Sequence, residues 1–201
     1  MKKEIEKYDV IIVGAGIAGI TTAYYLQKER PKSTYLILES LNNYGGTWYT
    51  HKYPGIRSDS DLYTFGFKFK PWTSAPIATA DEILKYLGET IKENQIDEHI
   101  RYNHKIIEAE WSTKKKSWIL KAERSDTKKI IYFSCNFLMM CQGYFRHNEG
   151  YTPKWKDMDK FKGQIVHTEE WPENLDYKNK RIILIGSGAT AATTVPAMAS
   201  K

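Results

Sequence analysis

Two short stretches of the sequence carry residue types and spacings that could bind a nucleotide. The first has the spacing GxGxxG, and the second repeats it as GxGxxA. In such a turn the first glycine permits a tight bend, the second lets the backbone approach a pyrophosphate, and the third lets a helix pack closely on a strand. The residues of the two turns are Gly14, Ala15, Gly16, Ile17, Ala18, Gly19, Gly186, Ser187, Gly188, Ala189, Thr190 and Ala191.

Glu39 strengthens the first of these motifs, because a glycine turn alone could be a bare tight bend. It lies 20 residues after Gly19, where an acid accepts hydrogen bonds from the ribose hydroxyls of an adenosine. An acid at this place favours FAD or NAD over NADP. The sequence therefore predicts a dinucleotide site at the first turn.

The elements around both turns fit this interpretation. Residues 8–13 are a β-branched run that predicts a strand, 17–30 predict a helix ending before Pro31, and 34–39 predict a second buried strand. Together they form a βαβ unit. The second turn follows a predicted strand at 182–185. Two such turns indicate two dinucleotides, and a flavin reduced by a nicotinamide is the usual reason for having both.

The rest of the chain predicts a mixed α/β protein. The alternation of Phe65, Phe67 and Phe69 predicts a half-buried strand, and apolar residues at helical spacing predict a helix over 80–95. Three strand-like pieces within residues 104–134 predict an antiparallel meander. Residues 136–143 predict one further strand, followed by a polar connector.

Composition excludes several classes of protein. The chain has 201 residues, 41% of them hydrophobic and 27% charged, which is typical of a globular protein. Its net charge of +6 comes from scattered lysines, so nucleic-acid binding is not expected. The histidines show no metal-ligand spacing. With no apolar leader, and an apolar run at 10–20 too short to span a bilayer, a cytoplasmic setting is expected.

Two longer patterns then carry a resemblance to a family. Residues 45–59 read GGTWYTHKYPGIRSD, and residues 161–172 read FKGQIVHTEEWP, which fits FxGxxxHxxxWP. Both patterns resemble those of flavin-dependent monooxygenases, more narrowly of the Baeyer–Villiger type. The residues within these patterns are most similar to those of the ethionamide-activating monooxygenase subgroup. Members of that subgroup are much longer than this chain.

The resemblance implies an activity that uses FAD and NADPH. In the family, NADPH reduces FAD, the reduced flavin takes up O2 as a C4a-peroxide, and that peroxide oxygenates a ketone, a sulfide or an amine. Asp59 matches the catalytic aspartate, which positions an arginine over the flavin; a carboxylate can hold and balance a guanidinium there. That arginine belongs to a later part of the family's sequence. The remainder of the same enzyme is thus expected to be needed for activity.

The predicted organisation follows from this resemblance. We expect an FAD-binding Rossmann-like domain with an antiparallel β-meander insertion at 1–145, a connector at 146–179, and the start of an NADPH-binding Rossmann-like domain at 180–201. The cofactor-binding residues predicted outside the two glycine turns are Glu39, Ser40, Gly46, Thr47, Trp48, Arg57, Ser58, Asp59, Ile106 and Gly143.

Simpler interpretations remain open for several residues. Trp48 could belong to the core, Asp59 could cap a helix that starts near residue 61, and His167 and Trp171 could order the connector rather than perform chemistry. Gly143 could be a plain turn glycine. At the level of the whole chain, the alternative to an enzyme is a non-catalytic FAD-binding module. A flavin disulfide reductase is disfavoured because Cys135 and Cys141 form no CxxC pair.

Overall fold

The chain folds into two compact units. A computed structural model describes residues 4–145 and 149–199. Unit 1 comprises Met1–Gly46 and Leu84–Tyr144, and unit 2 comprises Thr47–Ile83 and Phe145–Lys201. The domain boundaries expected from the sequence stay a prediction, and residues 146–148, where the expected connector begins, lie outside the described part.

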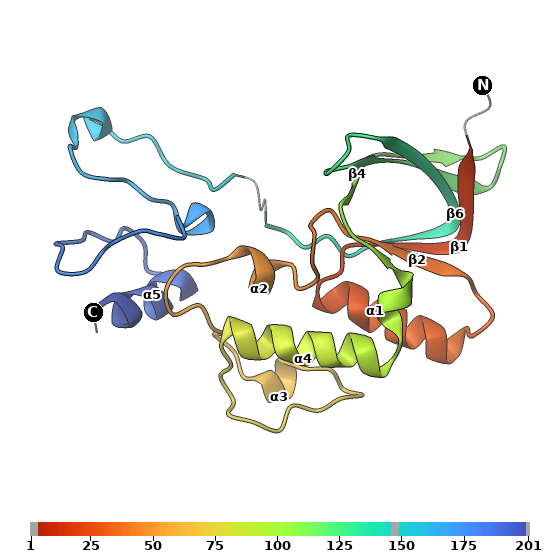
Figure 1. The fold of residues 1–201 in the computed structure, drawn as a ribbon, viewed down its shortest axis with the longest axis horizontal. Coiled ribbons are helices and arrows are strands. Elements are labelled where there is room, and N and C mark those ends of the chain that lie inside the picture. Colours follow the sequence, from red (N-terminus) through yellow and green to blue (C-terminus); the bar gives the residue numbers. More distant parts are fainter. Residues whose placement is uncertain (1–3, 146–148, 200–201) are drawn as a thin grey trace. The chain divides into compact units, whose positions relative to one another are not determined.

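Unit 1 is built on one six-stranded sheet with the strand order β3-β2-β1-β6-β5-β4 (Figure 1). The central strand β1 pairs in parallel with β2 on one edge and with β6 on the other. The meander β4-β5-β6 pairs antiparallel, as expected. The strands are β1 Ile5–Val13, β2 Tyr35–Leu38, β3 Ile100–Arg101, β4 His104–Ser112, β5 Ser117–Arg124 and β6 Ile130–Met140.

Two helices of unit 1 follow the expected pattern. Helix α1, Ile17–Glu29, connects β1 to β2 and buries Ile20 and Ala23, so the predicted βαβ unit is confirmed. Helix α4, Ala80–Glu93, also agrees with the prediction, and its residues in unit 1 bury one apolar face. The short 3-10 helix η1, Ile96–His99, then leads into β3.

The core of unit 1 lies against the middle of the sheet. Side chains from β1, β2, β5 and β6 meet there, because residues of one sheet face alternate along each strand. This packing holds the ends of β1, β2 and β6 together. The first glycine turn follows the end of β1 and therefore lies beside the ends of the other two strands. The buried residues of the cluster are Ile11, Leu36, Leu38, Leu120, Ala122, Phe133 and Cys135.

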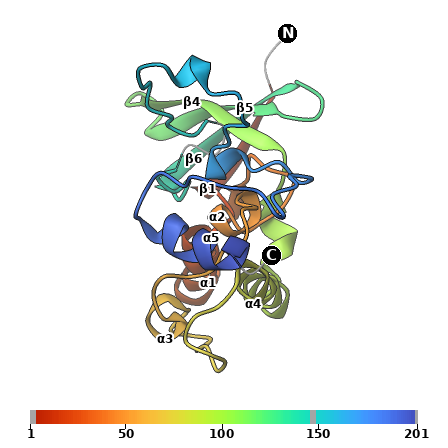
Figure 2. The same ribbon diagram turned by 90° about the vertical axis from the view of Figure 1, so that its left-hand side faces the viewer.

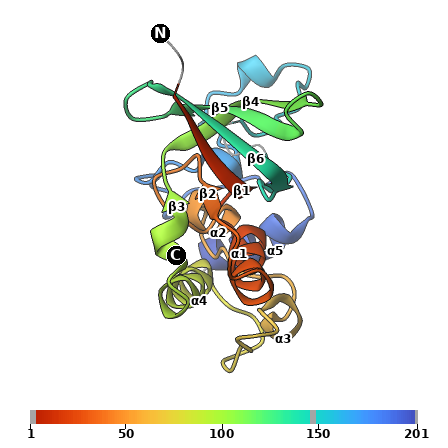
Figure 3. The same ribbon diagram turned by 90° about the vertical axis from the view of Figure 1, so that its right-hand side faces the viewer.

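Strand β6 differs from the prediction, which divided it into two strands. Cys135 pairs with Trp118 of β5 and also with Tyr8 of β1, so the chain passes from the meander into the parallel sheet without a break. Figure 3 shows β6 running beside β1. The division into two strands was wrong because β6 lies between β5 and β1 and pairs with both of them around Cys135.

Unit 2 has little regular structure between its short helices, as Figure 2 shows for the residues drawn in blue. The predicted strand at residues 65–69 is wrong. Helix α3 ends at Phe65, and its cap is Asp61, whose Oδ1 accepts a hydrogen bond from the Thr64 amide at 2.9 Å. The helices of this unit are α2 Thr47–Thr50, α3 Leu62–Phe65, η2 Met158–Lys160, η3 Thr168–Glu170 and α5 Ala189–Ala199.

The predicted strand at residues 182–185 is also wrong. These residues form no strand, and the side chains of Ile183 and Ile185 are 84% and 71% exposed. A parallel strand is buried only when neighbouring strands and covering helices surround it, and no strand within the described part of unit 2 could pair with it. The helix expected after the second glycine turn is present as α5.

The helices within residues 4–145 and 149–199 do not have the dimensions of a membrane span. None of the helices there is both long and apolar enough to cross a bilayer.

Candidate functional site

The first glycine turn joins β1 to α1. The Gly14 amide donates to the Leu38 carbonyl at 2.8 Å, and Gly14 has a φ of +101°. A Cβ atom on Gly14 would lie 2.6 Å from the Cys141 carbonyl oxygen, and one on Gly19 would overlap the Gly14 carbonyl oxygen. Space therefore requires glycine at both positions, because real Cβ atoms do not approach backbone that closely.

The start of α1 is suited to a phosphate group. Its first helical hydrogen bond runs from the Ile20 amide to the Gly16 carbonyl at 3.1 Å, so the preceding amides project from the helix end. The first turn holds no acidic residue that would repel an anion. A Cβ atom on Gly16 would meet nothing within 4 Å. The residues present thus fit a pyrophosphate beside Gly16.

Glu39 lies against this turn although it is distant in sequence. Its side chain is only 4% exposed. One carboxylate oxygen accepts from the Ala15 amide at 2.7 Å, and the other accepts from the Leu41 amide at 2.9 Å and from the Ser40 hydroxyl at 3.2 Å. Each carboxylate oxygen can accept more than one bond, so ribose hydroxyls remain possible partners.

The double glycine of the loop reaches the same turn. The Gly45 amide donates to the Ala15 carbonyl at 3.0 Å. A Cβ atom on Gly46 would lie 3.6 Å from the Gly16 Cα atom, so these two backbones lie side by side. Unit 1 therefore brings together the predicted residues of the first turn, Glu39, Ser40 and Gly46.

The segment after β2 is held to the meander. The Asn103 amide donates to the Leu41 carbonyl at 2.8 Å, and the Ser125 hydroxyl donates to the Ser40 carbonyl at 3.2 Å. Beside them, burial raises the pKa of Tyr102 to about 12, with smaller contributions in the same direction from Tyr44, Glu39 and Asp97. The phenol of Tyr102 is therefore neutral near Glu39 at ordinary pH.

Two predicted residues of unit 1 are less directly engaged. Ile106 is partly buried and packs against the core cluster at a register shift in β4. Gly143 is exposed, has a φ of +74°, and would meet nothing within 4 Å if it carried a Cβ atom. Its backbone conformation requires a glycine-like residue, whereas packing does not.

Four residues near the first glycine turn and Glu39 were not predicted from the sequence: Tyr44, Gly88, Tyr102 and Cys141. One signal was available. Gly88 stands in the middle of a predicted amphipathic helix, where glycine is costly and often marks a close approach by another group. The position of Tyr102 and Cys141 depends on how the meander and β6 pair, which no local pattern announces.

In unit 2, Thr47 and Trp48 belong to the short helix α2. The Trp48 indole is partly buried and packs edge-on against Phe65, with ring centroids 5.9 Å apart. His51 is buried and contacts Tyr53 edge-on at 5.9 Å. Trp48 is therefore neither fully buried in the core nor fully exposed: part of its ring packs on Phe65 and part is accessible to solvent.

The predicted Arg57-Ser58-Asp59 segment is fixed by the residue at its centre. Ser58 is buried; its amide donates to the Ala78 carbonyl at 2.8 Å, and its hydroxyl accepts from the Ala78 amide at 3.1 Å. Arg57 and Asp59 on either side are exposed. Since Asp61 caps α3, the capping interpretation of Asp59 is wrong.

The second glycine turn precedes α5, and the same unit places the Tyr-Pro-Gly loop against that helix. Gly186 has a φ of +137°, and the first turn of α5 holds no acidic residue. A Cβ atom on Gly55 would lie 2.5 Å from the Thr193 carbonyl oxygen and 2.7 Å from the Ala197 Cβ atom. The remaining residues of the predicted turn are Ser187, Gly188, Ala189, Thr190 and Ala191.

The fingerprint residues of the connector make structural contacts. The His167 Nδ1 atom accepts from the Glu169 amide at 3.2 Å and caps η3, while Glu170 accepts from the Gly150 amide at 3.1 Å. Trp171 packs edge-on against Tyr177 at 6.0 Å. These contacts favour the ordering role over acid-base chemistry.

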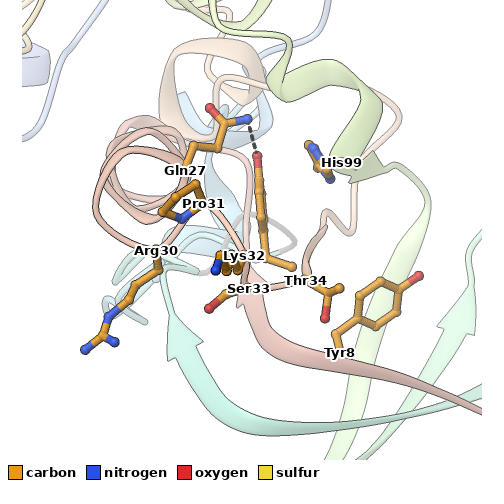
Figure 4. A pocket seen from close by; sticks show the side chains of 9 residues that line it. Tyr8, Gln27, Arg30, Pro31, Lys32, Ser33, Thr34 and His99 are labelled. Atoms are coloured by element: carbon orange, nitrogen blue, oxygen red, sulfur yellow. Dashed lines mark hydrogen bonds between the residues drawn. The ribbon is translucent and has the colours of Figure 1, made fainter.

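A hollow of about 480 Å³ lies at the other end of β2 from Glu39. Figure 4 shows Gln27 and His99 among the residues that line it. The Gln27 side-chain amide donates to the Tyr35 hydroxyl at 2.9 Å. His99 stacks on Tyr35 with centroids 4.2 Å apart. None of the predicted site residues lines this hollow, and the described residues contain no cluster of three potential metal ligands.

Comparison with known proteins gives two family matches. Residues 12–75 match the NAD(P)-binding Rossmann-like domain. Residues 74–201 match the flavin-binding monooxygenase-like family.

Individual relatives agree with these matches. The chain is 50% identical over 194 residues to the FAD-containing monooxygenase EthA of Mycolicibacterium smegmatis, covering 96% of this chain and 39% of that protein. A solved steroid monooxygenase bound to NADP is 30% identical with a TM-score of 0.79, covering 96% of this chain and 37% of that one. OTEMO in complex with FAD and NADP is 26% identical with a TM-score of 0.78, covering 98% and 38%. The chain thus spans well under half the length of these proteins.

Proposed function

The chain belongs to the flavin-binding monooxygenase-like family, and from this premise we propose that it supplies the FAD site and part of the NADPH site of a Baeyer–Villiger type monooxygenase. The substrate is a small ketone, sulfide or amine, together with O2. One oxygen atom of O2 enters the substrate and the other leaves as water, while NADPH supplies two electrons.

The observation that carries this proposal is the meeting of Glu39 with the first glycine turn. Its carboxylate accepts from the Ala15 amide at 2.7 Å, while the space beside Gly16 is open. One short region of unit 1 thus offers helix amides for a pyrophosphate and a buried carboxylate for a ribose. Bound FAD would supply the redox chemistry at this site.

The role of unit 2 follows by analogy with the family's motifs. We assign the pyrophosphate of NADPH to the turn Gly186–Ala191 and the flavin and nicotinamide rings to the Trp48 and Arg57-Ser58-Asp59 segments. The exposed Asp59 carboxylate is free of the capping role, which supports its assignment as the catalytic residue that holds an arginine. In this proposal residues 1–145 form the FAD domain, 146–179 the connector, and 180–201 the start of the NADPH domain.

Flavin binding by the chain itself tests the first part. We expect the purified chain to bind FAD, as measured by flavin fluorescence quenching. Glu39→Gln should weaken the affinity roughly tenfold, because one carboxylate oxygen that accepts hydrogen bonds is lost. Glu29→Gln, an exposed change on α1, is the matched control. A folded chain that binds no FAD contradicts the proposal.

A second candidate is a non-catalytic FAD-binding module. It is favoured by the exposure of Ile183 and Ile185 before the second turn, because residues 182–185 form no buried strand there. The two candidates separate when NADPH oxidation and O2 uptake are measured with FAD-loaded protein in which the chain is joined to the later part of the enzyme that carries the arginine. Flavin binding without either reaction supports the module, whereas NADPH-dependent O2 uptake supports the enzyme.

A further inference from the structure

Gly88 occupies a place where helix geometry does not call for glycine. It is buried in the middle of α4, and it is not among the glycines with positive φ. Alanine would form the helix better, so the reason for glycine must lie in space. A Cβ atom there would overlap the Tyr44 hydroxyl and lie 3.0 Å from the Tyr44 Cζ atom. Gly88 is thus the surface on which the Tyr44 phenol rests.

Tyr44 directly precedes the double glycine that approaches the first turn. The Tyr44 amide donates to the Asn43 side chain at 2.9 Å. The next residue, Gly45, is buried, and its amide bonds the Ala15 carbonyl at 3.0 Å. The double glycine has φ values of +116° at Gly45 and +55° at Gly46, so this short segment has few side chains of its own with which to hold its place. Tyr44 is the large side chain directly before this double glycine.

We propose that Tyr44 and Gly88 form a positioning pair that sets how closely the Gly45-Gly46 backbone approaches the first glycine turn. The inference rests on the proposed function, since its consequence is the shape of the FAD site. A phenol whose hydroxyl end meets a glycine of α4 fixes the loop at one distance from that helix. If the ring is displaced, the backbone of Gly46 moves relative to Gly16, and the space for a pyrophosphate changes.

The contact is specific enough to be tested by rescue. Gly88→Ala forces the Tyr44 ring outward, because the new methyl group would occupy the position of its hydroxyl. Replacing Tyr44 by Phe removes that hydroxyl and leaves Cζ, at 3.0 Å, as the nearest atom, which needs only a small adjustment. The double variant, Gly88→Ala with Tyr44→Phe, should therefore recover the FAD affinity that Gly88→Ala alone loses.

The experiment compares FAD dissociation constants of five proteins, measured by flavin fluorescence quenching together with the visible flavin spectrum. Gly88→Ala should bind FAD at least about tenfold more weakly and show an altered flavin spectrum. Tyr44→Phe should stay within about twofold of the unchanged chain, and the double variant within about threefold. Lys85→Ala, an exposed change on the same helix, is the control and should bind as the unchanged chain does.

Each outcome decides the matter. If Gly88→Ala folds, binds FAD normally and only melts at a higher temperature, glycine at this position affects helix stability alone and the inference is wrong. A double variant no better than Gly88→Ala also overturns it. If Gly88→Ala fails to fold, Tyr44→Ala, which leaves α4 unchanged, should show the same loss of FAD affinity; normal affinity there overturns the pair. If the unchanged chain binds no FAD, the proposed function itself fails, which is a different result.

Discussion

Gly14 follows a strand that is paired on both edges, whereas Gly186 follows residues that form no strand. The two turns share their spacing, and both open a helix whose first turn lacks an acid. In unit 1, however, β1 is held between β2 and β6. In unit 2 the preceding residue Ile185 is 71% exposed. A glycine turn is therefore a local feature, while the strand before it depends on partners distant in sequence.

The third position of each turn shows the same difference at the level of one atom. A Cβ atom on Gly19 would overlap the Gly14 carbonyl oxygen, because α1 packs closely on β1. The corresponding residue of the second turn is Ala191, which already carries that atom. The third position of the first turn thus has room only for glycine, whereas the second turn accommodates a Cβ atom at that position.

The largest expected effect concerns the strands themselves. Ile12 of β1 is 0% exposed and Ile183 is 84% exposed. Ile12→Ala should lower the free energy of unfolding by about 2–5 kcal/mol, because it removes buried surface and leaves a cavity. Ile183→Ala should change it by less than about 0.5 kcal/mol. Urea denaturation followed by tryptophan fluorescence measures both, and equal losses would contradict the contrast between the two regions.

The next effect concerns the middle glycine of each turn. A Cβ atom on Gly16 or on Gly188 would meet nothing within 4 Å, so alanine at either position should leave the melting temperature nearly unchanged. Gly16→Ala should nevertheless weaken FAD binding by roughly tenfold or more, because the methyl group occupies the space of the pyrophosphate. Gly188→Ala is the control.

Titration of the Gly16→Ala and Gly188→Ala variants with FAD, followed by fluorescence quenching, measures the two affinities. If Gly16→Ala binds FAD as tightly as the unchanged chain, the pyrophosphate does not lie beside Gly16.

The contrast also explains which parts of the fold could be read from the sequence. The βαβ unit and α4 were predictable because their signals are local: a β-branched run, a glycine turn, and apolar residues at helical spacing. The full length of β6 was not, since its first part pairs with β5, its last part pairs with β1, and Cys135 pairs with both, which depends on partners distant in sequence. The predicted strand at 182–185 failed for the complementary reason, because its apolar residues are suited to neighbours that unit 2 does not provide.

For the candidate site the limits are similar. Glu39 and the glycines of the two turns could be named from spacing alone, whereas Gly46 and Gly143 were named through the family resemblance. The contact of Tyr44 with Gly88 could not be predicted from the sequence. Helix α4 begins 36 residues after Tyr44, and only the fold brings the two residues together. The alternation of Phe65, Phe67 and Phe69 misled for a local reason. Asp61 caps a helical turn there, and Phe67 stacks on Phe69 with centroids 4.9 Å apart.

Within unit 2, two neighbouring acids separate structure from proposed chemistry. Asp61→Ala should cost about 1 kcal/mol of stability locally, because the Thr64 amide at the start of α3 loses its acceptor. Asp59→Ala should cost less than about 0.5 kcal/mol, since Asp59 is exposed and does not cap the helix. Urea denaturation distinguishes them. A larger loss for Asp59 would show that it stabilises the fold, and would weaken its assignment as a catalytic residue.

The smallest expected effect on stability comes from removing one ion pair in each unit. In unit 1, the Arg101 Nη1 atom donates a hydrogen bond to Glu6 Oε1 at 2.9 Å, and Nη2 lies 2.7 Å from Oε2, with the two side chains 35% and 36% exposed. In unit 2, Lys180 and Asp176 are 3.5 Å apart and far more exposed, at 58% and 70%. Glu6→Gln should cost less than about 1 kcal/mol at neutral pH, and Asp176→Asn nothing measurable, because solvent screens exposed pairs.

The pH dependence of the Glu6 effect follows from its pKa. The hydrogen bond from Arg101 is the largest cause that lowers the pKa of Glu6 below its ordinary value of 4.5. The folded state therefore binds this proton less readily than the unfolded chain does. The resulting stability is fully present above 4.5 and is lost as the pH falls through the lowered pKa. Urea denaturation at neutral pH and at a pH near 3 should show the difference between Glu6→Gln and the unchanged chain shrinking in acid. A difference that persists unchanged would mean that Glu6 stabilises unit 1 by packing rather than by charge.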